Sequence, residues 1–299
     1  MKTLISIVGT TGIGKTKLAI DLAKYYGTEI ISCDSRQFFK GMEIGTAAPS
    51  VEELSEVKHH LIGHLAVTDY YSIGQYEVDA LERVQQLFEK HDIVILVGGS
   101  MMYEKALIEG LNDLPEANEE NQQKLKKIWE NQGLEALQNL LKDLDPDYYA
   151  KVDLENPRRL LRAIDVMWQT SETYSTLISN PTHQRDFKTT RIGIEAPRKI
   201  IYERINKRVK LMVENGLLDE VKKLESHQNL VALKTVGYSE LFKYLNDEWE
   251  FDFAISEIQK NSRRFAKRQL TWYRKEENIL WVNYENAMAE SVSLLKEIL

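Results

Sequence analysis

The sequence predicts an α/β protein in which a parallel sheet covered by helices carries an inserted all-helical domain. Three observations lead to this fold class. Short apolar runs alternate with helical patterns early in the chain, strand patterns are missing from its middle, and a strand-like run follows that middle segment. Strands that alternate with helices are typical of a parallel sheet with helices on both faces.

Four apolar runs are predicted to be buried strands. Unbroken runs of β-branched residues, without polar alternation, suit parallel strands that are covered on both faces. The predicted strands are Thr3–Val8, Glu29–Cys33, Ile93–Val97 and Arg191–Ala196. Apolar residues at helical spacing predict helices between the first three strands, at Lys15–Tyr26 and Ile73–Lys90.

The segment from Leu111 to Arg185 has a different pattern. It contains no convincing strand, and its spacing predicts helices at Gln122–Gln132, Leu134–Leu144 and Arg158–Gln169. Residues 111–156 are acidic, with eleven Asp or Glu and five Lys. We therefore expect a core made of residues 1–111 and 186–299, interrupted by a helical insertion at 112–185 with Pro115 and Pro181 near its ends.

The overall composition limits the kinds of protein that this chain can be. With 43% hydrophobic and 28% charged residues, the 299-residue chain is that of an ordinary folded protein. Its net charge of −7 argues against a surface that binds polyanions indiscriminately. Because Cys33 is the single cysteine and no signal peptide or membrane-spanning run is present, we expect a cytoplasmic protein without membrane contact. Nothing in the sequence demands a dimer, so we expect a monomer.

A phosphate-binding loop follows the first predicted strand and opens the first predicted helix. Its sequence, GTTGIGKT, fits G-x-x-x-x-G-K-[ST], and it comprises Gly9, Thr10, Thr11, Gly12, Ile13, Gly14, Lys15 and Thr16. Glycines let backbone amides surround an anion, and the helix N-terminus adds partial positive charge. Lys15 supplies a mobile cation, and the Thr16 hydroxyl can bind Mg²⁺. The core is therefore predicted to be P-loop NTPase-like and to bind a diphosphate or a triphosphate.

An acidic residue ends the second predicted strand. Because ligands of such sheets bind beyond the carboxyl ends of the strands, Asp34 is expected to face the phosphate loop. Its carboxylate could bind Mg²⁺ through water or act as a general base, or it could simply cap the next turn. Ser35, Arg36 and Gln37 follow in a polar run that could contact a substrate.

The third strand ends without an acid, in Gly98, Gly99 and Ser100. ATPases and GTPases of this fold usually place a magnesium-binding aspartate at such a strand end, so its absence argues against a nucleotide-driven motor or switch. Two glycines permit close approach of a ligand to the backbone, and Ser100 adds a hydroxyl. A tight turn between strand and helix explains the two glycines equally well.

Clusters of basic residues occur at helical spacing in this acidic protein. Arg158 and Arg162 are one pair, Arg204 and Arg208 are another, and residues 258–275 carry seven Lys or Arg and no acid. Cations interleaved with aromatic residues suit a nucleic-acid backbone with bases that stack. A solvated helix face is the alternative interpretation.

Taken in order, these motifs resemble the tRNA dimethylallyltransferase (tRNA isopentenyltransferase) family over nearly the whole chain. Ser100 stands where the family usually has threonine, which keeps the hydroxyl. Gly63 stands where an aspartate is common, so no role of that aspartate is carried over. The similar segments are Gly9–Thr16, Asp34–Gln37, Gly41–Ala47, His59–Ile62, Tyr71–Ile73, Val97–Tyr103, Asn156–Ala163, Thr235–Tyr238 and, most distinctively, Ala266–Trp272 (AKRQLTW).

The resemblance implies transfer of a dimethylallyl group from dimethylallyl diphosphate to N6 of the adenosine at position 37 of tRNA, with release of diphosphate and help from Mg²⁺. It implies that Asp34 accepts the N6 proton and that Ser100 lies near the acceptor amine. The phosphate loop with Lys15 and Thr16 would hold the diphosphate. Arg208, with Arg204 as the alternative, would add a second cation.

The resemblance also implies that the insertion closes over the anticodon loop and that a long set of residues contacts tRNA. These are Asp34, Ser35, Arg36, Gln37, Ser100, Gln122, Arg158, Arg159, Arg162, Lys234, Gly237, Tyr238, Arg264, Lys267, Arg268 and Arg274.

Three other functions share the phosphate loop. A small-molecule kinase would use ATP there, a related transferase would modify free adenine nucleotides, and a binding module or switch would catalyse nothing. The kinase and the transferase that modifies free nucleotides would leave the basic stretch at 258–275 unused, which distinguishes them from a tRNA-modifying enzyme. The missing acid after Val97 argues against the binding module or switch.

Overall fold

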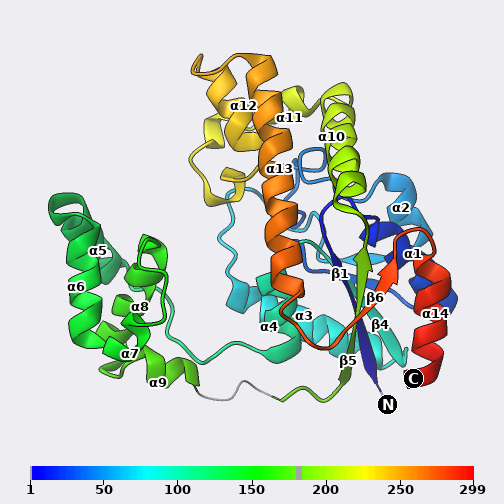
Figure 1. Ribbon diagram of the computed structural model, residues 1–299, viewed down its shortest axis with the longest axis horizontal. Helices are drawn as coiled ribbons and strands as arrows, with labels where there is room; N and C mark the ends of the chain where they lie inside the picture. Colours follow the sequence, from blue (N-terminus) through cyan, green and yellow to red (C-terminus); the bar gives the residue numbers. More distant parts are fainter. Residues whose placement is uncertain (1, 180–183) are drawn as a thin grey trace. The chain divides into compact units, whose positions relative to one another are not determined.

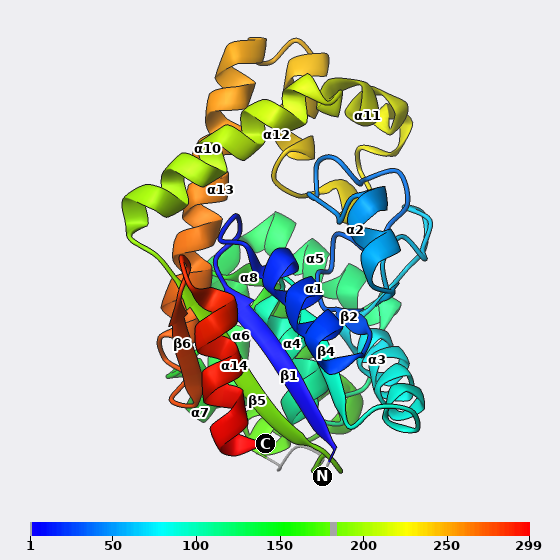
Figure 2. The same ribbon diagram turned by 90° about the vertical axis from the view of Figure 1, so that its right-hand side faces the viewer.

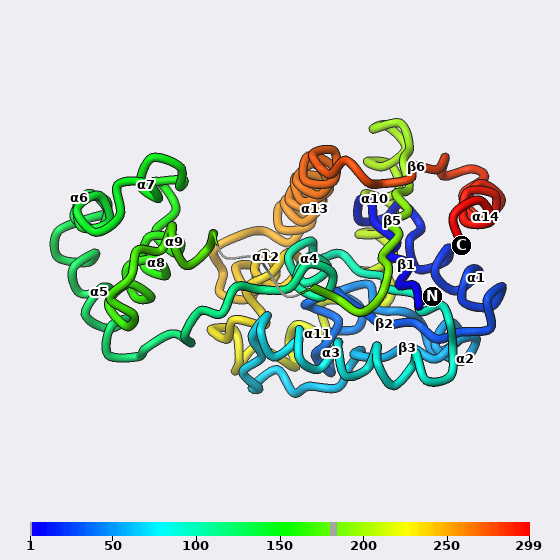
Figure 3. The backbone as a smooth tube through the Cα atoms, turned by 90° about the horizontal axis from the view of Figure 1, so that it is seen from below, coloured from blue at the N-terminus to red at the C-terminus, as the bar shows by residue number. Residues whose placement is uncertain are grey.

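The structure is a computed structural model that describes residues 2–179 and 184–299. The chain divides into two compact units, one formed by the residues up to Ile108 and from Arg185 onward, and one formed by Glu109–Gln184. Figure 3 shows by colour that the second unit is one continuous stretch of chain. It overlaps the expected insertion at 112–185, and Pro181 lies outside the described residues.

The first unit is built on a six-stranded sheet in which every pairing is parallel, with the strand order β3-β2-β4-β1-β5-β6. This confirms the predicted α/β fold class. The strands are β1 Thr3–Gly9, β2 Ile30–Ser32, β3 His59–His60, β4 Ile93–Val97, β5 Lys188–Glu195 and β6 Ile279–Asn283.

All four predicted strands are present, and the two outermost strands were not predicted. Strand β3 has only two residues, which is too short to show a pattern. Strand β6 has the same unbroken apolar character as the central strands, in the sequence ILWVN, so the run itself was a usable signal.

Alternate residues of the central strands face two separate hydrophobic cores. Ile5 packs in the core that contains α1 and α14, whereas its neighbour Leu4 packs in the core that contains α3. Figure 2 shows α1 and α14 lying together over one face of the sheet. Since successive side chains of a strand point to opposite faces, a run that is apolar at every position requires helices on both sides.

The helices of the first unit include both that were predicted. Lys15–Tyr26 is confirmed as α1, and the helix expected at Ile73–Lys90 ends at Phe88. These helices are α1 Lys15–Tyr26, α2 Val51–Glu56, α3 Ile73–Phe88, α4 Met101–Glu109 (which ends at the unit boundary), α10 Arg198–Glu214, α11 Leu217–Lys223, α12 Tyr238–Leu245, α13 Phe251–Tyr273 and α14 Ala287–Ile298. Within the described part of the chain, no helix is long and apolar enough to cross a membrane.

All regular secondary structure in the described residues of the second unit is helical. The three predicted helices are present with ends that differ by at most three residues, around a core that contains Leu125, Leu141 and Leu160. Asp165 is fully buried and accepts hydrogen bonds from the Asn118 amide at 3.3 Å and from the Asn121 side chain at 3.0 Å. The helices are α5 Glu119–Gln132, α6 Leu134–Leu144, α7 Pro146–Tyr149, α8 Pro157–Thr170 and α9 Tyr174–Ser179.

The register of the sheet brings three strand ends together. Ile7 of β1 and Ser32 of β2 both lie opposite Val97 of β4, so these three strands end at the same level. The segments that follow them, which carry the phosphate loop, Asp34 and Gly98, therefore meet at one edge of the sheet.

Candidate active site

The phosphate loop has the geometry that its glycines predict. Gly9 and Gly14 have φ values of 138° and 112°, in the region that favours glycine. A Cβ atom on Gly9 would lie only 3.0 Å from the Ile194 carbonyl oxygen, so a side chain there would force β5 to shift by a few tenths of an ångström. Gly14 precedes α1 with no side-chain cap, so the first amides of that helix stay available to an anion.

Lys15 folds over this loop. Its Nζ donates to the carbonyl oxygens of Gly9 at 3.1 Å and Thr10 at 2.9 Å. Burial lowers the pKa of Lys15 to about 8, against an opposing effect of the Asp34 carboxylate. A nearby anion would stabilise the charged form of such a buried lysine. This is the behaviour expected of a residue that binds phosphate.

The two candidate arginines of α10 have different partners. Arg208 Nη2 donates to the Thr11 hydroxyl at 2.7 Å, and Arg208 lines the pocket described below. Arg204 Nη1 donates to the Ile13 carbonyl at 2.8 Å, and its guanidinium lies 4.9 Å from the centre of the Tyr284 ring. Of the two arginines, Arg208 is therefore the one that lines the pocket.

Asp34 lies directly beyond β2, as expected. Its Oδ1 accepts from the Arg36 amide at 3.1 Å, so the capping interaction considered from the sequence is indeed formed. Burial raises the pKa of Asp34, although the Arg36 amide and Lys15 act in the opposite direction. The same carboxylate lines the pocket, so the cap leaves it available as a base of increased strength.

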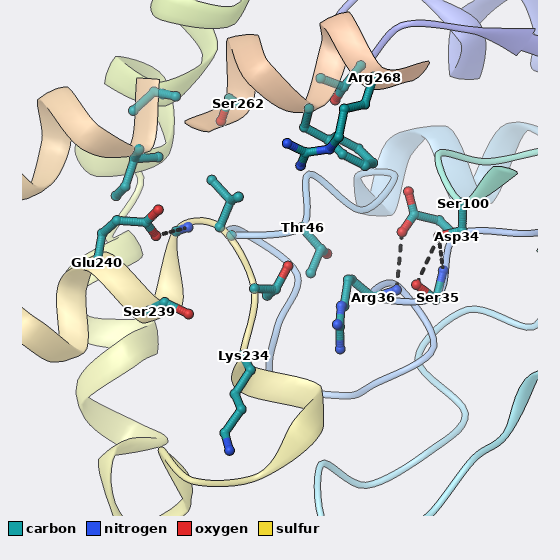
Figure 4. Close-up of a pocket in the computed structure, with 18 of the residues that line it drawn as sticks. Asp34, Ser35, Arg36, Thr46, Ser100, Lys234, Ser239, Glu240, Ser262 and Arg268 are labelled. Atoms are coloured by element: carbon teal, nitrogen blue, oxygen red, sulfur yellow. Dashed lines mark hydrogen bonds between the residues drawn. The ribbon is translucent and has the colours of Figure 1, made fainter. Parts of the chain in front are cut away.

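The two glycines after β4 are required by close packing on the Asp34 segment. A Cβ atom on Gly98 would lie 2.4 Å from the Cys33 carbonyl carbon, and one on Gly99 would lie 2.7 Å from Asp34 Oδ2. Ser100 Oγ accepts from the Ser35 amide at 2.9 Å and lies 2.9 Å from the Ser35 hydroxyl (Figure 4). Ser100 thus fixes the loop after Asp34 and also faces the pocket.

A pocket of about 570 Å³ joins these groups. That volume lies within the range of small-molecule sites. One part is lined by polar residues named above, which are Thr11, Asp34, Ser35, Arg36, Ser100 and Arg208. Lys15, whose Nζ lies on the Gly9 and Thr10 carbonyl oxygens, does not line the pocket. Apolar side chains of α4, α10, α13 and the segment before α12 line another part. Figure 4 shows Lys234, Glu240 and Arg268 around the same space. The apolar lining comprises Met101, Met102, Tyr103, Val209, Met212, Val236, Ile258 and Phe265.

Buried hydrogen bonds hold the far wall of the pocket. The Glu220 carboxylate accepts from the Ile44 and Gly45 amides, both at 2.8 Å, and from the Tyr238 hydroxyl at 2.6 Å. Tyr238 is fully buried. A direct contact of its side chain with RNA therefore does not fit this structure, and its position supports the wall instead, whereas its neighbours Lys234 and Gly237 do line the pocket.

Two residues of the polar run after Asp34 also have structural partners. Arg36 Nη1 donates to the carbonyl oxygens of Val231 and Ala232, both at 3.0 Å. Gln37 Nε2 donates to the carbonyl oxygens of Thr46 and Ala47. Arg36 lines the pocket, while Gln37 does not.

The basic stretch forms an open groove along the end of α13. The groove is lined by Arg264, Lys267, Arg268, Thr271, Trp272 and Lys275. The Arg268 guanidinium lies 5.6 Å from the centre of the Phe265 ring. Lys260, near the start of the stretch, pairs with Glu257 at 2.8 Å, so an acid does neutralise that one residue. Among the described residues, the groove itself contains no acid.

Comparisons with known proteins agree with this arrangement. A sequence model described as IPP transferase matches residues 37–276. A protein named tRNA dimethylallyltransferase 1 from Bacteroides thetaiotaomicron is 46% identical over 95% of this chain and 92% of its own length. A tRNA dimethylallyltransferase from Christiangramia forsetii is 47% identical over 94% of this chain and 93% of its own.

This chain belongs to the IPP transferase family. A solved structure, the full-length tRNA isopentenylpyrophosphate transferase from Bacillus halodurans, agrees with a TM-score of 0.73 and 33% identity, over 99% of this chain and 96% of that one. The family, and the P-loop NTPase-like α/β fold with a helical segment, are therefore those that the sequence motifs indicated.

The second unit of this IPP transferase family member carries four predicted tRNA-binding residues. Arg158 and Arg159 are exposed in the first turn of α8, and Gln122 is partly exposed on α5. Arg162 Nη2 donates to the Pro115 carbonyl at 2.6 Å, and its Nη1 lies 3.6 Å from Asp165 Oδ2. Arg162 therefore contributes to the internal structure of this unit.

One residue of the family motif AKRQLTW supports the site without having been predicted to do so. Gln269 is fully buried on α13 and hydrogen-bonds both the phosphate loop and the Gly99 carbonyl. Its place between Arg268 and Leu270, as an uncharged polar residue on a basic helix, was a weak signal for such a role.

Proposed function

We propose that this protein transfers the dimethylallyl group of dimethylallyl diphosphate to N6 of the adenosine at position 37 of tRNA. The observation that carries the proposal is the single pocket into which Thr11, Arg208, Asp34 and apolar side chains all project. In the reaction the bond between C1 of the dimethylallyl group and the diphosphate oxygen breaks. A bond from C1 to N6 forms, N6 loses one proton, and diphosphate leaves.

The donor half of the pocket supports departure of the diphosphate. Negative charge grows on the leaving oxygen as the allylic bond breaks, and fixed cations and amides stabilise that charge. Arg208 lines the pocket and supplies one cation, and Lys15, whose Nζ lies on the Gly9 and Thr10 carbonyl oxygens, would supply the other. The uncapped amides at the start of α1 would add to them. The apolar side chains, Met101 and Phe265 among them, suit a five-carbon hydrocarbon and exclude water from the reactive carbon.

The acceptor half of the pocket contains the base. An exocyclic adenine amine is a weak nucleophile, and it reaches a partly enclosed carboxylate only when the adenosine leaves its stack. Asp34 would orient this amine and take its proton, and Ser100 holds the Asp34 loop in place. The raised pKa of Asp34 suits it to accepting that proton.

The residues present fit a magnesium ion that is shared with the substrate. Mg²⁺ usually keeps several waters and takes one or two protein groups together with phosphate oxygens, so no protein cage is needed. The Thr16 hydroxyl, partly exposed at the start of α1, would hold the ion, which would neutralise diphosphate charge.

The groove on α13 is proposed to bind the RNA backbone, and Trp272 offers a surface on which a base can stack. We also propose that Arg158, Arg159 and Gln122 of the second unit contact the anticodon stem-loop. As part of the same proposal the protein works as a monomer in the cytoplasm.

The test is incubation of the protein with Mg²⁺, dimethylallyl diphosphate and an anticodon stem-loop that has adenosines at positions 36–38. The expected result is an RNA heavier by one isoprenyl unit at position 37 and release of one diphosphate. Asp34→Ala should lower turnover by about 10²–10⁴-fold while RNA binding persists. A product on free adenine nucleotides only, or phosphorylation of a small acceptor that depends on ATP, would reject the proposal.

A further inference from the structure

Gln269 lies between the two halves of the proposed active site. Its side chain is fully buried. Its Oε1 accepts from the Thr11 amide at 2.7 Å, and its Nε2 donates to the Gly99 carbonyl at 2.8 Å. One amide group therefore hydrogen-bonds the phosphate loop after β1 and the glycine turn after β4.

Each partner of Gln269 lies next to a side chain of the proposed active site. Thr11 carries the hydroxyl to which Arg208 donates. Gly99 packs against Asp34 so closely that a Cβ atom there would lie 2.7 Å from Asp34 Oδ2 and 3.5 Å from Gln269 Nε2. A shift of the Gln269 side chain would therefore move the diphosphate loop and the Asp34 carboxylate relative to each other.

Only an amide side chain of this length fits the two partners. The Thr11 amide requires an acceptor and the Gly99 carbonyl requires a donor, and both lie in a buried place where an unpaired group is costly. Glutamate can serve the Thr11 amide, but it presents a second carboxylate oxygen to the Gly99 carbonyl. Leucine serves neither partner.

We propose that Gln269 is a positioning residue that fixes the distance between the diphosphate site and Asp34. It touches neither substrate and acts through Thr11 and Gly99. The inference rests on the proposed function, because it assumes that the loop holds the leaving group and that Asp34 is the base. Displacement of reacting groups by about 1 Å can lower a rate by about 10²-fold.

The experiment compares Gln269→Leu and Gln269→Glu with the wild type in single-turnover prenylation of the stem-loop. For Gln269→Glu we expect a rate about 10²-fold lower at saturating substrates and a KM for dimethylallyl diphosphate close to that of the wild type, because the bond to Thr11 is kept. For Gln269→Leu we expect the same loss of rate together with a raised KM. Affinity for the stem-loop should stay within twofold for both variants.

The matched control is Gln259→Leu, on the same helix at a partly exposed position away from the pocket and the α13 groove. It should behave as the wild type. Combination with Asp34→Asn separates positioning from general damage: once the base is lost, Gln269→Glu should lower the residual rate no further. Thermal unfolding of each variant identifies any that do not fold, and Gln269→Glu, which keeps the size of the side chain, remains informative if Gln269→Leu unfolds.

The outcomes are distinguishable. If the wild type does not prenylate the stem-loop, the proposed function fails. If it does, wild-type rates in folded Gln269→Glu would overturn the positioning role. The positioning role would also be overturned if the double variant lost rate by the product of the two single-variant factors, since Gln269 would then act independently of the base.

Discussion

Replacement of Gly99 by alanine tests whether the Asp34 carboxylate must stay where the structure places it. The backbone of Gly99 is not in the left-handed region, so an alanine meets no conformational strain there. Its Cβ would, however, lie 2.7 Å from Asp34 Oδ2, where ordinary contacts begin at 3.4 Å. The carboxylate must therefore move by about 0.7 Å, or the turn must move away from it.

A displacement of this size predicts a kinetic defect. Misplacement of a reacting group by about 1 Å costs about 10²-fold in rate, which corresponds to about 2.7 kcal/mol of activation free energy. The assay is single-turnover prenylation of the stem-loop at saturating dimethylallyl diphosphate, with thermal unfolding measured alongside. We expect the Gly99→Ala rate to fall by that factor while stem-loop affinity stays within twofold.

The matched control is Gly74→Ala in the first turn of α3. There a Cβ atom would meet nothing closer than the Ser72 hydroxyl at 3.7 Å, an ordinary contact. Alanine in a helix is favoured over glycine by about 0.5–1 kcal/mol, so this variant should be fully active and slightly more stable. A Gly99→Ala protein with the wild-type rate would refute the link between the position of Asp34 and catalysis.

Three further predictions follow from the site. Arg208→Ala should lower kcat/KM for dimethylallyl diphosphate by about 10²–10³-fold, whereas Arg204→Ala on the preceding turn should cost less than tenfold; equal losses in steady-state assays would contradict the assignment. Because Lys15 has a pKa of about 8 and binds an anion best when protonated, kcat/KM should fall by up to about tenfold per pH unit above pH 8; a profile that stays flat to about pH 9.5 would count against this role. Arg264→Ala should weaken stem-loop binding. It should also reduce by about one unit the slope of the logarithm of the binding constant against the logarithm of the KCl concentration. An unchanged slope would show that Arg264 is not part of the interface.

Much of the fold could be predicted from the sequence because its signals are local. The apolar runs of β1 and β4, the helical spacing of α1 and the glycines of the phosphate loop each depend on neighbours within a few residues. Edge strand β3 escaped prediction because two residues carry no period. The phosphate loop and Asp34 were predictable for a similar reason, since both directly follow strands whose carboxyl ends share one edge.

Other parts of the site depend on contacts between distant residues. Arg204 and Arg208 are one helical turn apart and indistinguishable by spacing, and only the loop packed against α10 makes Arg208 the pocket residue. Tyr238 belongs to a motif expected to contact RNA, yet Glu220 and the Gly45 loop enclose it.

The sequence by itself determined the class of fold, the phosphate loop, the acid beyond β2 and the family, because each is recognised from short stretches of consecutive residues. The tertiary structure decided which side chains share a pocket and which support it. Gln269 and Thr11 are 258 positions apart, and their hydrogen bond exists only because α13 packs beside the end of β1. No local sequence pattern predicts a contact between residues so far apart in the chain, since that contact results from the packing of the whole first unit.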